Sequence, residues 1–437
     1  MEHAHVNAHT LRQILDRGQD PLAMRLLLHQ VSVCAGCRER LHPLYELVTS
    51  GLLPDDGSFT ALDLALAVSR YQAPALWAEL SELPESEWSQ RVQEDPRFAS
   101  WGFVEHLCAM SRSTANGQPA RALAMCELAE ELAEVAHCDQ LPESIRPELR
   151  MLAVAHRANV YRVLDDEQVA ERLFRKAEAH WEVAEDEFLH YRPLVLALRT
   201  SLLVSKRLMD DAFETVREGL ILARDLSTPR PELVAHLQIL QAIVLAETGR
   251  VEEAGDVLAD AARGIDPQQH PLLWTALRHN QVDCLTRLER YEEAAELMPE
   301  VEAFVADTGF EHTKVRLGWT WARIHQGLGR FEEAIGLYDA ARQYFLEESM
   351  PFTYAIASLE LASVFLELGY TQQVQRIAAE VLPTFQARDV HREVFAALSL
   401  FQSAAAVDKV SKEMVLDIAH YLRQARTNPK LRFEPGS

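Results

Sequence analysis

The 437-residue chain has few of the residues that mark non-helical folds. It contains only 17 Gly and 19 Pro, and regularly spaced β-branched runs are missing. A β-sheet protein is therefore disfavoured. Ala, Leu and Glu dominate the composition, which predicts an almost wholly helical protein. The length suits about two to four average domains, or one extended solenoid.

Long apolar runs and basic blocks are also missing. The longest apolar stretches, such as residues 61–68, are interrupted by charge and are far shorter than the ~20 residues that span a bilayer. No basic region leads into an apolar run at the N-terminus, so no secretion signal is expected. The formal net charge is −23 with Lys and Arg dispersed, a surface that repels a phosphate backbone. We expect a cytoplasmic protein that binds neither membranes nor nucleic acids directly.

What is present is a repeat. Segments 247–261, 287–301, 326–340 and 367–381 each contain a turn, two acidic or amide residues, a small residue and two spaced apolar residues. Such internal periodicity is the signature of a repeat architecture. The small position falls at Ala122, Ala170, Ala212, Ala254, Ala294, Ala334 and Val374, at intervals of 40 to 48 residues. A second, usually small position lies twelve residues earlier, at Ala158, Ala242, Ala322 and Ala362.

This pattern resembles the tetratricopeptide repeat, whose two antiparallel helices cross at small residues. Residues 152–177 match best, with Ala158, Tyr161, Ala170, Phe174 and Ala177 at the family's offsets. The period exceeds the usual ~34 residues, so extra length is predicted in longer helices or in Pro-containing loops such as 227–233 and 266–273. The resemblance implies an all-α, right-handed TPR-like solenoid of about seven to eight helical hairpins with a concave binding face.

In that family the first helix of each pair lines the concave groove. Arg316, Trp319 and Arg323 share one helix face and suggest an anchor for an acidic or extended peptide. The alternative is that Trp319 belongs to the core between repeats and that the arginines pair with nearby acids. The arrangement of Lys and Asn with which chaperone-binding members hold a terminal carboxylate is absent from these positions. The polar or aromatic residues at groove offsets are Asn159, Arg162, His236, His279, Asp283, Arg316, Trp319, Arg323 and Gln326.

Catalytic signatures are missing. The sequence contains no Gly-rich phosphate loop, nucleophile elbow or helical HExxH. Acid pairs begin at Glu252, Glu292 and Glu332, the same place in three repeats, which is typical of a solvated first helical turn. His279 and Cys284 are five residues apart on a predicted helix and point away from each other. We therefore expect no enzymatic activity.

The six cysteines are scattered except for one pair. Cys34 and Cys37 form a CxxC motif that can offer two thiolates to a zinc ion, and His29 lies shortly before them. The alternative is a CxxC at a helix end that binds nothing. Positions 108, 126, 138 and 284 lie in apolar helical surroundings, where reduced thiols behave as small hydrophobes.

With a histidine ahead of its first helix, this segment resembles the zinc-binding anti-sigma domain. The resemblance implies a structural Zn²⁺ held by His5, His29, Cys34 and Cys37. His3 and His9 are alternatives to His5. Four residues separate His29 from Cys34, one more than in the commonest family form. Family members use this head to bind an RNA polymerase sigma factor.

These features predict a zinc-binding head at residues 1–50, a helical bridging segment or flexible connector at 51–98, a solenoid at 99–425 and a tail at 426–437. We expect a regulatory adaptor or sensor that binds protein or peptide partners in its groove, with a head that binds a sigma factor or another regulator. The alternative is a structural scaffold in which zinc is purely structural. Such a scaffold would assemble a multiprotein complex, for example by binding or inhibiting a co-encoded protease or defence effector.

Overall fold

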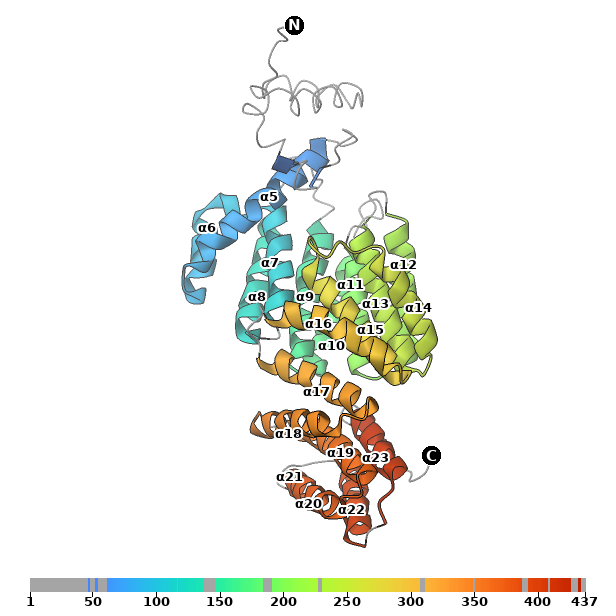
Figure 1. Ribbon diagram of the computed structural model, residues 1–437. Coiled ribbons are helices and arrows are strands. Elements are labelled where there is room, and N and C mark those ends of the chain that lie inside the picture. Colours follow the sequence, from blue (N-terminus) through green and yellow to red (C-terminus); the bar gives the residue numbers. More distant parts are fainter. Residues whose placement is uncertain are drawn as a thin grey trace. The chain divides into compact units, whose positions relative to one another are not determined.

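The computed structural model is helical and forms two compact units. Residues 1–202 form the N-terminal unit and residues 203–437 the C-terminal unit, with the boundary inside helix α11 (Arg192–Ser205). The structure describes residues 46–47, 52–53, 61–115, 117–136, 146–183, 191–226, 230–306, 311–348, 350–386, 392–407, 409–425 and 431–433. Within these residues the elements are helices joined by turns, which confirms the all-α prediction (Figure 1).

In the N-terminal unit, the first long helix among the described residues packs on the repeats. Helix α5 crosses α7, α7 packs on α8 and α9, and α9 pairs with α10. The elements are α5 (Ala61–Ser81), the 3₁₀ turns η1 (Glu85–Glu87) and η2 (Pro96–Phe98), α6 (Trp88–Glu94), α7 (Trp101–Thr114), α8 (Pro119–Val135), α9 (Arg146–Val163), α10 (Glu167–Val183) and α11.

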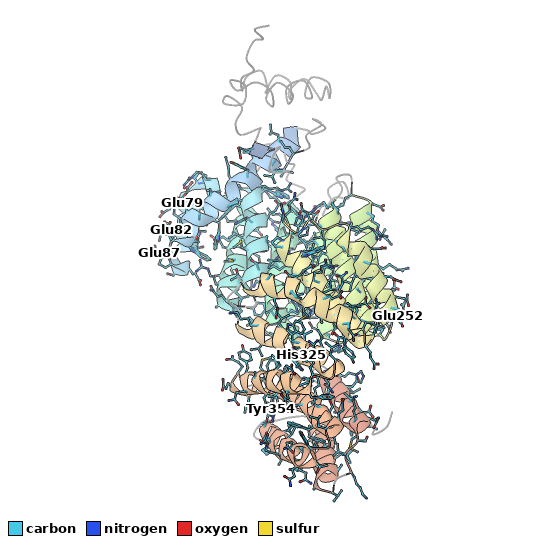
Figure 2. The ribbon with its side chains drawn as sticks, viewed as in Figure 1. Glu79, Glu82, Glu87, Glu252, His325 and Tyr354 are labelled. Atoms are coloured by element: carbon cyan, nitrogen blue, oxygen red, sulfur yellow. The ribbon has the colours of Figure 1, made fainter. Side chains whose placement is uncertain are left out.

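The segment predicted as a bridge or connector is built into the core of this unit. Leu80, Trp88 and Phe98 are almost fully buried, while Glu79, Glu82 and other acids of this segment face outward (Figure 2). At the crossing of α5 and α7, a Cβ on Gly102 would lie 2.5 Å from backbone atoms of Ser69 and Arg70. The amide of Gly102 donates to the hydroxyl of Ser69 at 2.7 Å. Glycine therefore permits a backbone approach that no other residue allows.

The C-terminal unit continues the hairpins. Successive helices pair as α13 with α14, α15 with α16, and α17 with α18. Helices α13, α15 and α19 begin with Pro231, Pro271 and Pro351, as the loop prediction implies, because proline suits the first helical position. The helices are α12 (Met209–Arg224), α13 (Pro231–Glu247), α14 (Val251–Ala262), α15 (Pro271–Arg287), α16 (Tyr291–Ala306), α17 (Glu311–Gly327), α18 (Phe331–Glu347), α19 (Pro351–Glu367), α20 (Thr371–Val381), α21 (Pro383–Gln386), α22 (Arg392–Ala406) and α23 (Lys412–Ala425).

Small residues occupy the predicted crossing points inside the hairpins. Each is at most 2% exposed, which confirms the tetratricopeptide-like pattern, since a small side chain lets two helices pack closely. These residues are Ala122, Ala158, Ala170, Ala212, Ala242, Ala254, Ala294, Ala322, Ala334, Ala362 and Val374.

The turns of the six hairpins from α9–α10 to α19–α20 have the same backbone conformation. A residue with φ between 58° and 84° follows the first helix in each of these six, and the next amide bonds back to a carbonyl five residues earlier, as Arg250 does to Leu245 at 2.9 Å. This is the Schellman motif, which usually carries glycine. The residues with positive φ are Asp165, Arg207, Gly249, Glu289, Gly329 and Gly369.

The last helix pair is inverted relative to this pattern. Helix α22 packs on α20, whereas α23 packs on α19 (Figure 1). Helix α23, the second helix of its pair, thus lies beside α19, where the first helix of a further hairpin would lie. Part of the predicted tail returns to this helix: the rings of Tyr421 and Phe433 pack at 59° to each other with centroids 5.0 Å apart, and Tyr421 donates to the carbonyl of Leu431.

Candidate functional site

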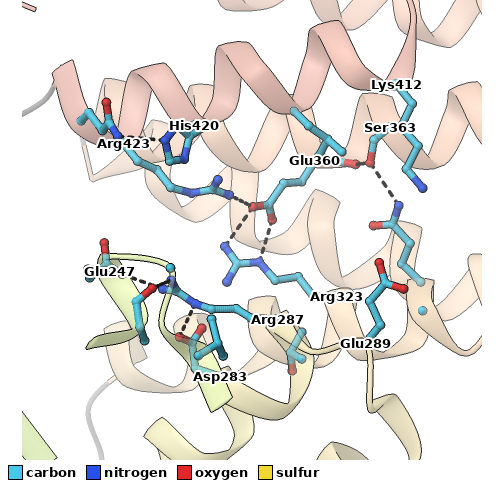
Figure 3. A pocket seen from close by; sticks show the side chains of 18 of the residues that line it. Glu247, Asp283, Arg287, Glu289, Arg323, Glu360, Ser363, Lys412, His420 and Arg423 are labelled. Atoms are coloured by element: carbon cyan, nitrogen blue, oxygen red, sulfur yellow. Dashed lines mark hydrogen bonds and ion pairs between the residues drawn. The ribbon is translucent and has the colours of Figure 1, made fainter. Parts of the chain in front are cut away.

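A cavity of about 1210 Å³ lies in the C-terminal unit. Its wall is formed by the last turns of α13, α15, α17 and α19, together with α23 and Leu431 (Figure 3). Because the hairpins repeat, these last turns place equivalent residues side by side along one face. The cavity lies on this shared face, and ten of its 25 lining residues carry charged side chains.

The first part of this wall is a chain of ion pairs across three repeats. Glu247 bonds to Arg207 and, at 2.6 Å, to Arg287. Arg287 also contacts Asp283 at 2.7 Å and the carbonyl of Ala246 at 3.1 Å. Burial alone would raise the pKa of Glu247, but the two arginines outweigh it and the pKa is lowered. These four charged groups neutralise one another.

The second part centres on Glu360, whose side chain is only 6% exposed. Arg323 donates to both carboxylate oxygens, at 2.9 and 3.0 Å, and the indole of Trp319 donates to one of them at 2.6 Å. Arg423 of α23 donates to the same carboxylate (Figure 3). Burial opposes ionisation of Glu360, but Arg323 and Arg423 keep its pKa below the ordinary value. One buried carboxylate thus serves two guanidinium groups.

The third part joins α17, α19 and α23. Gln326 donates to Ser363 at 3.1 Å and to Glu367 at 2.8 Å, while its own oxygen accepts from Tyr338. Lys412 approaches Glu367 at 2.7 Å. Both polar ends of Gln326 are therefore occupied, and its side chain is fixed.

An apolar strip runs beside these charges. Met209, Val251 and Tyr291 are the first residues of α12, α14 and α16 and line the cavity, as does Leu416 of α23, which is 43% exposed. A Cβ on Gly327 would lie 2.4 Å from ring atoms of Tyr291, so this ring packs directly on the backbone of α17. The cavity combines fixed charges with exposed apolar surface.

Three of the predicted groove residues line this cavity: Asp283, Arg323 and Gln326. Trp319 adjoins it by its bond to Glu360, and its ring packs on Phe345 with centroids 5.3 Å apart. The pairing of Arg323 with an acid and the packing of Trp319 match the alternative sequence interpretation. Arg323 also lies over the Trp319 ring at 4.7 Å, a cation–π contact.

The remaining predicted groove residues do not line the cavity. Arg316 is exposed on α17. His279 is half-buried, and burial, Arg316 and Arg323 lower its pKa. Asn159 belongs to the N-terminal unit, is 4% exposed and accepts a bond from Arg162 at 3.0 Å. His236 of α13 is not among the residues that line the cavity. None of these five residues lines the cavity, although His279 lies close enough to Arg316, Asp283 and Arg323 to interact with their charges.

Sequence reasoning missed several of the principal groups. Glu247 and Arg287 are 40 residues apart and could have been found by extending the groove offsets to the last helical turn. Glu360 corresponds in the repeat to Thr320, which carries no charge, so the repeat pattern gave no signal for it. Arg423 belongs to the inverted pair and has no equivalent at all.

The thiols of the described residues are buried, as predicted. Cys108, Cys126 and Cys284 are at most 4% exposed. Burial raises the pKa of Cys126 to about 12 and that of Cys284 to about 11, so both stay protonated and apolar in character.

The predicted zinc ligands His5, His29, Cys34 and Cys37 lie outside the described residues. Among the residues that are described, no group of three or more His, Cys, Asp or Glu side chains is placed to hold a metal ion. Nor does any described helix have the length and apolar character needed to cross a membrane.

Comparison with known proteins leaves the family open. No family model and no curated sequence matches the chain. Among solved structures, the Rap protein complexed with Competence and Sporulation Factor shares 13% identity, with a TM-score of 0.44 over 74% of this chain and 99% of that one. BtubC (BKLC) from P. vanneervenii shares 17% identity, with a TM-score of 0.24 over 73% of this chain and 96% of that one.

A third similar structure is the Signal Transduction ATPase with Numerous Domains (STAND) protein with a tetratricopeptide repeat sensor from Pyrococcus horikoshii. It shares 15% identity, with a TM-score of 0.33 over 98% of this chain and 66% of that one. Similarity this low does not establish a shared fold. The repeat architecture of this chain rests on its own buried small residues and helix pairing.

Proposed function

We propose that this chain is a non-enzymatic regulatory adaptor whose C-terminal unit binds a segment of a partner protein in the charged cavity. The observation that supports this most is the cavity itself. At about 1210 Å³ it is larger than the roughly 300–1,000 Å³ typical of pockets for small ligands. Its wall joins several repeats, as a site for an extended chain would require.

The composition of the wall also favours a peptide. Ion pairs hold the polar side chains in fixed positions, which lowers the entropy lost on binding. Tyr291, Met209 and Leu416 supply apolar surface beside them, and an anchor that becomes desolvated at the centre of an interface contributes most to affinity. A partner segment with both polar and apolar side chains fits such a wall.

Affinity capture from the native host tests this function. The baits are the full chain, a Leu416→Arg variant in the cavity and a matched Leu346→Arg variant; Leu416 and Leu346 are 43% and 45% exposed. We expect partners that the wild type and Leu346→Arg capture and that Leu416→Arg loses. Identical sets from all three baits would show that the cavity does not bind the partner.

For the N-terminal head we propose structural zinc bound by His5, His29, Cys34 and Cys37, with a sigma factor or another regulator as partner. The CxxC motif and its neighbouring histidines support this proposal. Metal analysis of the full chain should find about one zinc ion per molecule, lost in Cys34→Ser and Cys37→Ser. Equal zinc in wild type and variants would contradict it, and a capture that never contains a sigma factor would favour the scaffold alternative.

A further inference from the structure

The inverted helix pair places an additional guanidinium in the cavity. Arg323 comes from the regular repeat and uses Nε and one terminal nitrogen on Glu360. Arg423 comes from α23 and approaches the same carboxylate, which already accepts from Trp319. With the bond from Arg423 the carboxylate accepts four hydrogen bonds, which uses its roughly four acceptor sites, so it can accept no further bond from Arg423.

Arg423, like Arg207 and Lys412, has unused donors, but it shares its one carboxylate with a second arginine that has no other carboxylate partner among the described residues. A guanidinium has five N–H bonds, and within the described part of the chain Arg423 donates only to Glu360, through one terminal nitrogen. Its side chain lines the cavity and is 35% exposed. Arg287, in contrast, is engaged on Asp283, Glu247 and a backbone carbonyl.

The cavity lining carries five Arg or Lys side chains and five acidic ones, but its ion pairs leave two guanidinium groups on one carboxylate. Arg207 and Arg287 face Glu247 and Asp283, and Lys412 faces Glu367. Arg323 and Arg423 share Glu360 alone. Burial and the nearby Arg323 and Arg287 lower the pKa of Arg423 although Glu360 opposes this. A second anion beside Arg423 would remove this imbalance.

We propose that Arg423, together with Arg323, forms a carboxylate subsite that binds an acidic side chain of the partner segment. This inference rests on the proposed peptide-binding function. The planar guanidinium fork of Arg423 matches a carboxylate with two parallel hydrogen bonds. Tyr291 and Leu416 line the same cavity, so the acidic residue would be accompanied by apolar neighbours. Recognition acts at short range, since the overall charge of −23 gives an acidic ligand no long-range attraction.

The test begins with a displayed library of random nonapeptides selected on the full chain. Parallel selections use Arg423→Gln, Arg423→Lys and a matched control, Arg376→Gln. Arg376 lies on α20, is 62% exposed and pairs with Glu380 at 3.6 Å. Sequencing should show enrichment of Asp and Glu on the wild type and on Arg376→Gln. This enrichment should be reduced on Arg423→Lys and absent on Arg423→Gln.

Fluorescence anisotropy then measures one selected peptide, its Glu→Gln analogue and its phosphoserine analogue. The Glu peptide should bind wild type roughly 10- to 150-fold more tightly than the Gln analogue. Arg423→Gln should bind both equally, with an affinity close to that of wild type for the Gln analogue. That second value separates loss of the subsite from loss of folding.

The outcomes distinguish the two proposals. If selected peptides bind and Leu416→Arg abolishes binding, but acids are not enriched, the carboxylate subsite is wrong while the groove function stands. Tighter binding of the phosphoserine analogue than of the Glu peptide would replace the carboxylate with a phosphate. If no peptide is selected on the wild type, the peptide-binding function fails and the subsite with it.

Discussion

The two units differ in what the polar residues of their first helices contact. In the N-terminal unit, Ser111, His156, Asn159 and Thr200 are at most 4% exposed and fill the interior. In the C-terminal unit, polar residues of the corresponding first helices line a cavity of about 1210 Å³. A repeat architecture therefore fixes where the helices lie but not whether the polar side chains of the first helices fill the interior or line a cavity.

Removal of the charge of Glu360 should have the largest effect on the stability of the C-terminal unit. Glu360→Gln leaves Arg323 and Arg423 without a buried counter-charge, so we expect unfolding of the C-terminal unit to become easier by about 3–5 kcal/mol. Urea denaturation gives the size of the loss, and hydrogen exchange shows which unit opens. Glu214→Gln, which removes an exposed partner of Arg217, is the control and should change stability by less than about 0.5 kcal/mol.

The result would contradict this account if Glu360→Gln behaved like its control. It would also do so if the N-terminal unit became the first to exchange.

Acid should lower the stability of the N-terminal unit through His156. Burial, with Arg112 adding repulsion and a backbone bond to Cys108 opposing, lowers the pKa of His156 from 6.5 to about 3. The unfolded chain takes up this proton below pH 6.5 and the folded chain does not, so the stability is complete above that pH and falls as pH drops towards 3. At pH 4 the loss should be about 3 kcal/mol.

The measurement is the urea midpoint of the N-terminal unit between pH 7 and pH 4. In His156→Gln the dependence on pH should flatten, whatever the variant's stability at pH 7. The control is His420→Gln, on the exposed side of α23, which should keep the wild-type slope. An unchanged slope in His156→Gln would show that other groups carry the acid sensitivity.

Two glycine substitutions compare packing in the two units directly. Gly102→Ala places a methyl group 2.5 Å from the backbone of α5, and we expect the N-terminal unit to lose about 1–3 kcal/mol. Gly255→Ala in α14 meets no atom within 4 Å, so it should stabilise the C-terminal unit by about 0.5–1 kcal/mol. Thermal and urea unfolding measure both. Equal effects would mean that the close crossing of α5 and α7 does not contribute to the stability of the N-terminal unit.

The sequence predicted the parts of the molecule that depend on periodicity. Buried alanines such as Ala254 and Ala334 follow from helix crossing, which requires small side chains at fixed spacing. Asp283, Arg323 and Gln326 reached the cavity because the first helix of each pair presents the same face in every repeat. Asn159 occupies an equivalent place in its repeat but is buried. The position in the repeat predicts the direction of a side chain, but not which other residues pack over it.

The charged centre could not be predicted for two physical reasons. Glu360 stands where the other repeats have uncharged residues such as Thr320, and its role depends on contact with an adjacent repeat. Arg423 enters because α23 rather than α22 packs on α19. Which of these two helices lies beside α19 depends on packing at the end of the array, and the repeat pattern does not predict it.

Three of the described hairpin turns carry a residue other than glycine in the left-handed backbone conformation. Asp165 is tolerable in a left-handed conformation, since Asp and Asn visit it more readily than other side chains. Arg207 and Glu289, with φ of 58° and 59°, occupy it at a disadvantage of roughly 1–2 kcal/mol each, and both line the cavity. Glycine, found at the turns of Gly329 and Gly369, would relieve the strain and remove the charge. Of the three hairpin turns that line the cavity, two thus carry a charged side chain in this strained conformation, while the third carries Gly249.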